Sequence, residues 1–137
     1  MTSNQTIAVT TVFSLGLALA PTVWANPASD ACAALANART ALYSMTIAKD
    51  KSAQDAWNAK VQAASTKLDS ALAGMTGADA KVASDFKAVW DQFKATRENE
   101  IIPAIYKGNA DDAKKIVDGI QAQRLSKMWR IMSCKVR

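Results

Sequence analysis

The sequence predicts an all-helical protein, an up-down-up-down antiparallel four-helix bundle. The chain is rich in alanine, lysine and leucine and contains only five glycines and three prolines, a composition that favours helix. Its apolar residues recur three and four positions apart, as one face of a helix requires, and never alternate as they do in a strand. Four such segments are joined by very short turns, and short turns make successive helices antiparallel neighbours.

The chain opens with an apolar leader that carries no charge. Ile7–Ala20 has the length of a signal-peptide core, and Val23-Trp24-Ala25 fits the small-x-small cleavage pattern. We therefore interpret residues 1–25 as a signal peptide and Asn26 as the first mature residue. The usual basic residues before the apolar core are missing, so an uncleaved anchor is the alternative. Against an anchor, serine, threonine and proline interrupt the run, and it is shorter than the ~20 apolar residues of a spanning helix.

Residues 26–137 are expected to form one domain, which begins with two helices. The first is predicted to start near Ser29 or Asp30 and to end near Lys49. The second is predicted to start at Ser52, because Ser52-Ala-Gln-Asp55 resembles a capping box, and to end at Gly74. Their apolar stripes are Leu35, Ala38, Leu42 and Met45, and Trp57, Val61, Ala64, Leu68 and Leu72.

The third and fourth helices have comparable start signals. Thr76-Gly-Ala-Asp79 opens the third, which Pro103 is expected to kink or end and which Gly108 closes. Asn109 is the predicted cap of the fourth, followed by two aspartates that suit the helix dipole. Their apolar positions are Val82, Phe86, Val89, Trp90, Phe93 and Ile101, and Ala113, Ile116, Val117, Ile120, Leu125, Met128, Trp129 and Met132.

The only two cysteines, Cys32 and Cys134, lie near the start and the end of this domain. In the predicted topology both are at the same end of the bundle, and an exported protein meets oxidants that join cysteines. We expect an intramolecular disulfide, although ideal helices would leave the two residues ~9 Å apart in height. The alternatives are a bridge between two chains of a dimer and two free thiols.

Composition excludes several classes of function. The net charge of +5 is spread along the chain without a basic run, so nucleic acid is not expected as a partner, whereas acidic partners or small anions fit. Because the sequence contains no histidine, it offers no imidazole ligand for a metal or haem and no imidazole base. We expect no metal, no cofactor and no enzymatic activity.

Three arginines on or beside the apolar stripes suggest a ligand site. Counted from the turns at the far end of the bundle, Arg39, Arg97 and Arg124 agree in height within ~6 Å. Ser65 and Thr66 of the second helix are expected at a similar level. Because a guanidinium presents a planar fork that matches carboxylates, these five residues predict a pocket for a small organic anion.

The competing interpretation is structural. The arginine stems would lie along the edge of the core with their charged heads in water, and Glu98, Glu100 and Asp69 would pair with them. Methionines and tryptophans at helical spacing are interpreted as core rather than as soft metal ligands or an aromatic pocket. These residues are Met45, Met75, Met128 and Met132, and Trp57, Trp90 and Trp129.

The second half of the chain carries a resemblance. The run from Phe86, FKAVWDQFKATRENEIIPAIYKGNADDAKKIVDGIQAQRLSKM, has an aromatic helix, an Arg/Glu-rich segment and a Gly-Asn turn followed by acids. It resembles the four-helix-bundle ligand-binding domains of bacterial methyl-accepting chemotaxis receptors, a likeness that extends over residues 35–130. The resemblance implies a sensor for a small ligand, here as a soluble stand-alone version without a signalling region.

Two functional hypotheses follow. The first is a periplasmic or secreted ligand-binding or sensor bundle, with a small organic anion as its ligand and a second copy or a membrane receptor as its partner. After cleavage of the leader, such a protein would have no stable membrane insertion. The alternative is a periplasmic adaptor that binds another protein through a helical face or acts as a dimer.

Overall fold

The computed structural model describes residues 26–135, and within this range every regular element is helical. The predicted signal peptide, residues 1–25, lies outside the described residues. The elements are α1 (Pro27–Ile47), α2 (Lys51–Ala73), the 3-10 turn η1 (Gly77–Asp79), α3 (Ala80–Thr96), the π turn η2 (Arg97–Ile101), α4 (Ile102–Tyr106), α5 (Ala110–Ile116), the π turn η3 (Val117–Gln121) and α6 (Ala122–Met132).

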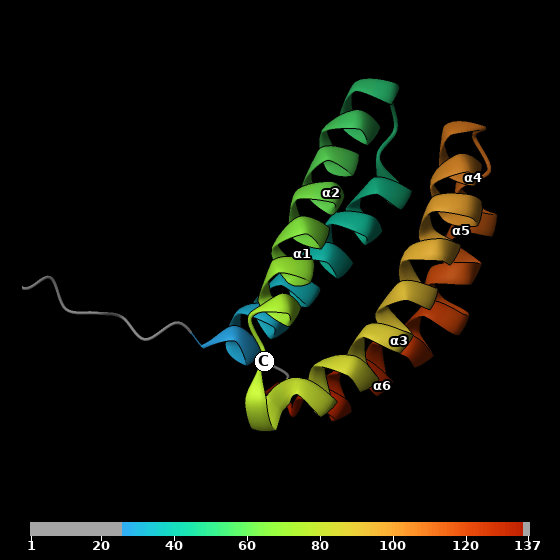
Figure 1. The fold of residues 1–137 in the computed structure, drawn as a ribbon. Coiled ribbons are helices and arrows are strands. Elements are labelled where there is room, and N and C mark those ends of the chain that lie inside the picture. The colour runs from blue at the N-terminus through green and yellow to red at the C-terminus, as the bar shows by residue number, and fades with distance from the viewer. Residues whose placement is uncertain (1–25, 136–137) are drawn as a thin grey trace, which may run out of the picture.

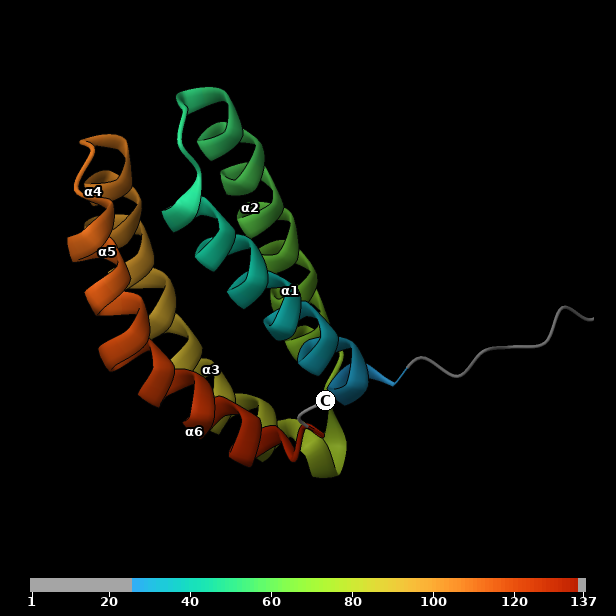
Figure 2. The ribbon, with the colours of Figure 1, turned by 180° about the vertical axis from the view of Figure 1, so that it is seen from behind.

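The helices are arranged in two pairs. α1 lies beside α2. The continuous rod formed by α3, η2 and α4, called the third rod, lies beside the rod formed by α5, η3 and α6, called the last rod (Figures 1 and 2). The segment around η1 joins the two pairs at one end of the molecule, where α1 also begins and α6 ends. The prediction of four helical segments is confirmed, with the refinement that each of the last two contains a π turn.

Side chains cap the first two helices, whereas the predicted caps Thr76 and Asn109 occupy the N-cap positions of η1 and α5 without a side-chain capping hydrogen bond. Asn26 caps α1, since its side-chain oxygen accepts a hydrogen bond from the backbone N–H of Ser29 at 3.1 Å. The predicted cap of α2 at Ser52 is wrong. Asp50 has the extended backbone of a cap and accepts from the N–H of Ala53 at 2.8 Å, so the helix has already begun when the chain reaches Ser52.

Pro103 neither ends nor breaks the third rod. A proline lacks the N–H that an α-helix would use, and the π turn η2 directly before it changes the hydrogen-bond register. There the N–H of Ile102 donates to the carbonyl of Arg97, five residues back. The second π turn, η3, was not predicted from the sequence; it includes Gly119, whose φ of −92° and ψ of −106° depart from helix geometry.

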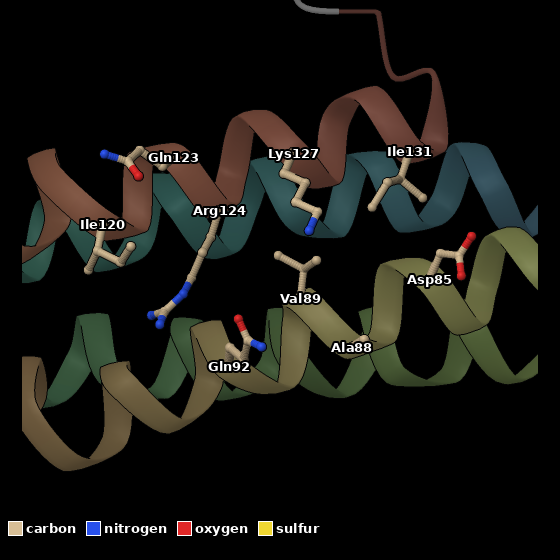
Figure 3. Close-up of a pocket in the computed structure, with 9 residues that line it drawn as sticks. All are labelled: Asp85, Ala88, Val89, Gln92, Ile120, Gln123, Arg124, Lys127 and Ile131. Carbon is tan, nitrogen blue, oxygen red and sulfur yellow. The ribbon is translucent and has the colours of Figure 1, made fainter.

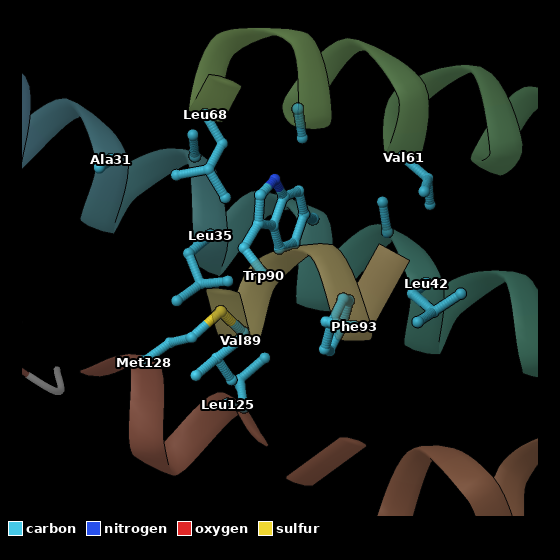
Figure 4. Packing of buried hydrophobic residues seen from close by; sticks show 14 of the residues in the cluster. Ala31, Leu35, Leu42, Val61, Leu68, Val89, Trp90, Phe93, Leu125 and Met128 are labelled. Carbon is cyan, nitrogen blue, oxygen red and sulfur yellow. The ribbon is translucent and has the colours of Figure 1, made fainter. Parts of the chain in front are cut away.

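Most residues of the predicted apolar stripes lie in the core, which draws on all four segments (Figure 4). Ile120, predicted as part of the last stripe, is instead 45% exposed. Trp90 and Phe93 of α3 form its centre, with ring centroids 5.4 Å apart, and both are fully buried. The four methionines predicted as core, Met45, Met75, Met128 and Met132, are all buried. Of the three tryptophans interpreted as core, Trp57 and Trp129 are only half-buried at its edge.

The intramolecular disulfide is confirmed. Cys32 and Cys134 are bonded to each other, with their Cα atoms 5.6 Å apart. The chain leaves helix geometry after Met132, because Ser133 adopts a left-handed conformation with φ of 53°. Cys134 then donates its N–H to the carbonyl of Trp129 at 2.9 Å, which completes a Schellman turn. This turn bends the chain toward α1 and removes the mismatch in height that ideal helices imply.

Candidate functional site

Arg97 is a buried cation whose guanidinium is bound by other side chains of the same protein. Its side chain is only 2% exposed, although it carries a charge. Nη1 donates to the Ser65 hydroxyl at 2.8 Å, and Nε and Nη2 both lie 2.8 Å from Oε1 of Glu98. The guanidinium also lies 5.6 Å from the ring centre of Trp90. With its donors occupied in this way, Arg97 joins α2 to the third rod and has no free face for a ligand.

Arg124 has a different environment. Its Nη1 donates to the hydroxyl of Thr96 at 2.7 Å and to the side-chain oxygen of Gln121 at 3.0 Å. Both acceptors are neutral, and within residues 26–135 no carboxylate forms an ion pair with Arg124. Gln121 is itself held in place, because its amide nitrogen donates to the carbonyl of Phe93 at 2.9 Å. The guanidinium is therefore oriented without having its charge neutralised.

Arg124 lines an open groove of about 600 Å³ between α3 and α6. Figure 3 shows the side chains of Arg124 and Lys127 pointing from α6 toward α3, with Gln92 opposite Arg124. Two cations thus lie one helical turn apart along the same wall. The remaining lining residues are Asp85, Ala88, Val89, Ile120, Gln123 and Ile131.

The charges of the groove are uneven along its length. Asp85 lies at one end, where it accepts from Lys81 at 2.7 Å on the exposed surface. The opposite end, around Arg124, is bordered by Gln92 and by the apolar side chain of Ile120, which is 45% exposed. A negatively charged group would consequently be attracted to the Arg124 end rather than to the Asp85 end, where Lys81 offsets the charge of Asp85.

Arg39 lies at a third place, on α1. Its guanidinium carbon is 5.5 Å from the ring centre of Trp129. It lines a smaller cavity of about 180 Å³ between α1 and the last rod. The predicted cluster of three arginines is therefore distributed over three separate environments.

The two predicted hydroxyl partners also separate. Ser65 is buried, donates to the carbonyl of Val61 at 2.8 Å and accepts from Arg97. Thr66 is exposed on the other side of α2 and donates to the carbonyl of Gln62 at 3.2 Å. The structure thus brings Ser65 and Arg97 together, and it places Thr66, Arg39 and Arg124 elsewhere.

Sequence reasoning missed two residues that bind Arg124, Gln121 and Thr96, and one that lines its groove, Lys127. Gln121 precedes Arg124 by one helical turn, so the spacing contained a signal for their contact. Thr96 reaches Arg124 from another helix, and Lys127 resembles any exposed lysine, so neither had a signal in one sequence. Thr96 and Lys127 became visible as parts of the site only when α3 and α6 were paired.

A cluster at the far end of the molecule connects α2 with α4. The Tyr106 hydroxyl donates to Oδ1 of Asp55 at 2.7 Å, and Lys51 approaches Oδ2 of the same carboxylate at 2.8 Å. The hydrogen bonds from Lys51 and Tyr106 lower the pKa of Asp55. The hydrogen bond to Asp55 in turn raises the pKa of Tyr106. Because these groups bind one another, we interpret them as a clamp between helices.

Two properties concern the whole described range. Residues 26–135 contain no group of three cysteine, aspartate or glutamate side chains placed to hold a metal ion. No helix in this part of the chain combines the length and the apolarity that crossing a membrane requires.

Neither a protein-family model, nor a characterised protein, nor a solved structure matches this chain.

Proposed function

We propose that this protein is an exported, non-catalytic helical bundle that binds a small organic anion in the groove between α3 and α6. The observation that carries the proposal is the state of Arg124. Two neutral side chains hold its guanidinium in one orientation, and among the described residues no carboxylate neutralises it. A carboxylate ligand would supply the missing charge.

The hydrogen-bond donors that Arg124 has left over support this role. Nη1 is used by Thr96 and Gln121, whereas Nε and Nη2 have no partner within the described part of the chain. A guanidinium binds a carboxylate best through two parallel N–H groups, and Nε and Nη2 form one such edge. Lys127 adds a second positive charge that attracts an anion along the groove.

The apolar lining restricts the ligand. Val89, Ile120 and Ile131 border the same groove, so an aliphatic body would lose water against them while the carboxylate binds Arg124. At the far end Asp85 is paired with Lys81, so that end offers no positive charge to bind a second carboxylate. The ligand class that fits best is a small aliphatic monocarboxylate.

The proposal includes an up-down-up-down antiparallel topology and a periplasmic or secreted location. The Cys32–Cys134 bond and the Tyr106–Asp55 hydrogen bond support the topology, because they tie α1 to α6 and α2 to α4. A disulfide also fits an oxidising compartment. The likeness to chemotaxis-receptor sensor domains supports a sensing role, and a membrane receptor would then be the partner.

A ligand screen tests the binding function. The full chain is expressed with its leader in a bacterium and purified from the periplasm, and mass spectrometry determines whether Asn26 is the first residue. The oxidised protein is then melted with acetate, butyrate, succinate and citrate. A ligand at one hundred times its Kd stabilises by ~2.7 kcal/mol. We expect butyrate to stabilise the protein and Arg124→Gln to abolish this effect.

The matched control is Arg130→Gln, which removes the same charge from an exposed position of α6 outside the groove. It should leave the stabilisation unchanged. A screen in which no acid raises the melting temperature, or in which both variants lose the effect equally, would contradict the proposed site.

The alternative function, binding of a second copy or of another protein, has one observation in its favour. Ile120 is a large apolar side chain exposed at the edge of the groove. If this edge is an interface, the purified chain will be dimeric by light scattering, and Ile120→Asp will make it monomeric. A monomer that binds butyrate would exclude this alternative.

A further inference from the structure

The cavity beside Arg39 is distinct from the α3–α6 groove. It has a volume of about 180 Å³ and lies between α1, α3 and the last rod. Its floor combines the buried apolar side chains of Leu42, Phe93 and Leu125 with the buried polar side chain of Gln121. Two aromatic rings, Tyr43 of α1 and Trp129 of α6, form walls that reach the surface. The cavity is thus mainly apolar at its base and aromatic at its sides.

The π turn η3 borders this cavity. Val117, Asp118 and Gln121 of η3 line it, and the small residue Ala122 follows them. A larger side chain at Ala122 would take up space between the last rod and α1. The sequence instead leaves a volume comparable to cavities that hold a benzene molecule, which are about 150 Å³.

The mouth of the cavity carries one available cation. Arg39 is exposed and stacks on Trp129, and within residues 26–135 it has neither an ion pair nor a hydrogen bond. The carboxylate that lines the same cavity, Asp118, is bound by Lys114. The guanidinium of Arg39 therefore has all its donors available next to an aromatic wall.

We propose that this cavity binds a small aromatic carboxylate of the size of benzoate. The ring would occupy the space between Tyr43 and Trp129, and the carboxylate would bind Arg39 at the mouth. An aromatic ring suits the two aromatic walls, which favour offset or edge-to-face contacts with it. The site does not depend on the function proposed for the Arg124 groove, since the two share no cation. Gln121 connects them, because it lines this cavity and accepts a hydrogen bond from Arg124.

Benzoate is the probe, and the indole N–H of Trp129 is the reporter. In a two-dimensional NMR spectrum of the oxidised protein, this resonance is assigned from its loss in Trp129→Phe. Titration with benzoate should shift it in a saturable manner. Acetate lacks the ring and benzyl alcohol lacks the charge, so each should bind more weakly. Loss of a charged hydrogen bond weakens binding by roughly 10- to 100-fold.

Two variants test the two halves of the site. Arg39→Gln removes the cation from an exposed position and should weaken benzoate binding by about tenfold or more. Ala122→Leu adds a side chain at the cavity wall and should prevent the titration shift. Lys49→Gln, which removes a cation from an exposed position outside both sites, is the control and should bind benzoate as the parent does.

Three results would overturn the inference. One is the absence of any shift at about 10 mM benzoate, where even a millimolar site is nearly saturated. Another is a shift that persists unchanged in both Arg39→Gln and Ala122→Leu. The third is equal binding of benzyl alcohol and benzoate. Stabilisation by butyrate through Arg124 would be unaffected by these results, so this inference and the proposed function fail independently.

Discussion

Reduction of the Cys32–Cys134 bond should destabilise the protein strongly. The two cysteines are 102 positions apart, so the bond closes almost the whole domain into one loop. A loop of about 100 residues restricts the unfolded chain by an entropy worth ~4.7 kcal/mol at 25 °C. Domains of this size unfold with a total free energy of only about 5–15 kcal/mol. The disulfide is therefore expected to account for a large share of the stability.

Guanidinium unfolding, followed by far-UV circular dichroism, measures this share. Comparing oxidised with reduced protein retains both sulfur atoms, so the packing of the half-buried cysteines against the core is preserved and only the cross-link changes. We expect a loss of about 3–5 kcal/mol and a fall in melting temperature of roughly 15–25 °C.

The control is the double variant Cys32→Ala/Cys134→Ala, which should resemble the reduced protein and ignore the reductant. A loss below about 1 kcal/mol would refute the reasoning, because it would mean that the cross-link does not restrict the unfolded chain as the loop length requires. A dimer that separates on reduction would contradict the intramolecular pairing itself.

Three further predictions concern stability and pH. Gly108→Ala should lower the free energy of unfolding by about 1 kcal/mol, because Gly108 follows α4 with a φ of +81°, a conformation that is strained for alanine. Arg97→Met should lower the free energy of unfolding less than Glu98→Ala does, because the first removes the buried charge whereas the second leaves that charge without its carboxylate. Since Glu98 is 43% exposed, water limits the loss in Glu98→Ala to about 2 kcal/mol. The lowered pKa of Asp55 stabilises the fold above the pKa of the unfolded chain, and this contribution disappears as pH falls through the folded value. The raised pKa of Tyr106 stabilises the fold below the pKa of the unfolded chain, and this stabilisation is lost as pH rises through the folded pKa. Asp55→Asn should abolish both pKa shifts, as measured by NMR titration.

Each of these expectations has an outcome that contradicts it. A neutral Gly108→Ala, measured beside Lys107→Ala as the control, would mean that the turn tolerates an ordinary residue. A larger loss for Arg97→Met than for Glu98→Ala would indicate that the ion pair stabilises the fold as a whole. If Tyr106 titrates at its usual pKa both in the parent and in Asp55→Asn, the clamp between α2 and α4 does not form in solution.

The candidate site illustrates how far one sequence reaches. Two of the three arginines on or beside the apolar stripes, Arg97 and Arg124, have side-chain partners, and one partner of Arg97 is Ser65. Arg39 is exposed and lies only against the ring of Trp129. The common pocket, however, depended on which side of its helix each arginine faces. For Arg124 the π turn η3 alters that facing, because a five-residue register rotates the side chains that follow it relative to those before it. Periodicity counted at 3.6 residues per turn cannot detect such a rotation.

Local information in the sequence determined the helical class, the apolar stripes, the turn glycines and the cysteine pair. The first three of these features depend on residues within a few positions of one another. The cysteine pair follows because the chain has only two cysteines, which can bond only to each other within one molecule. Tertiary structure decided the rest: that Asp50 caps α2, that Pro103 is accommodated by a π turn, and that Arg124 is held by Thr96 across the α3–α6 contact. Such features arise from packing between segments distant in sequence, where small rotations of a helix decide which side chains meet.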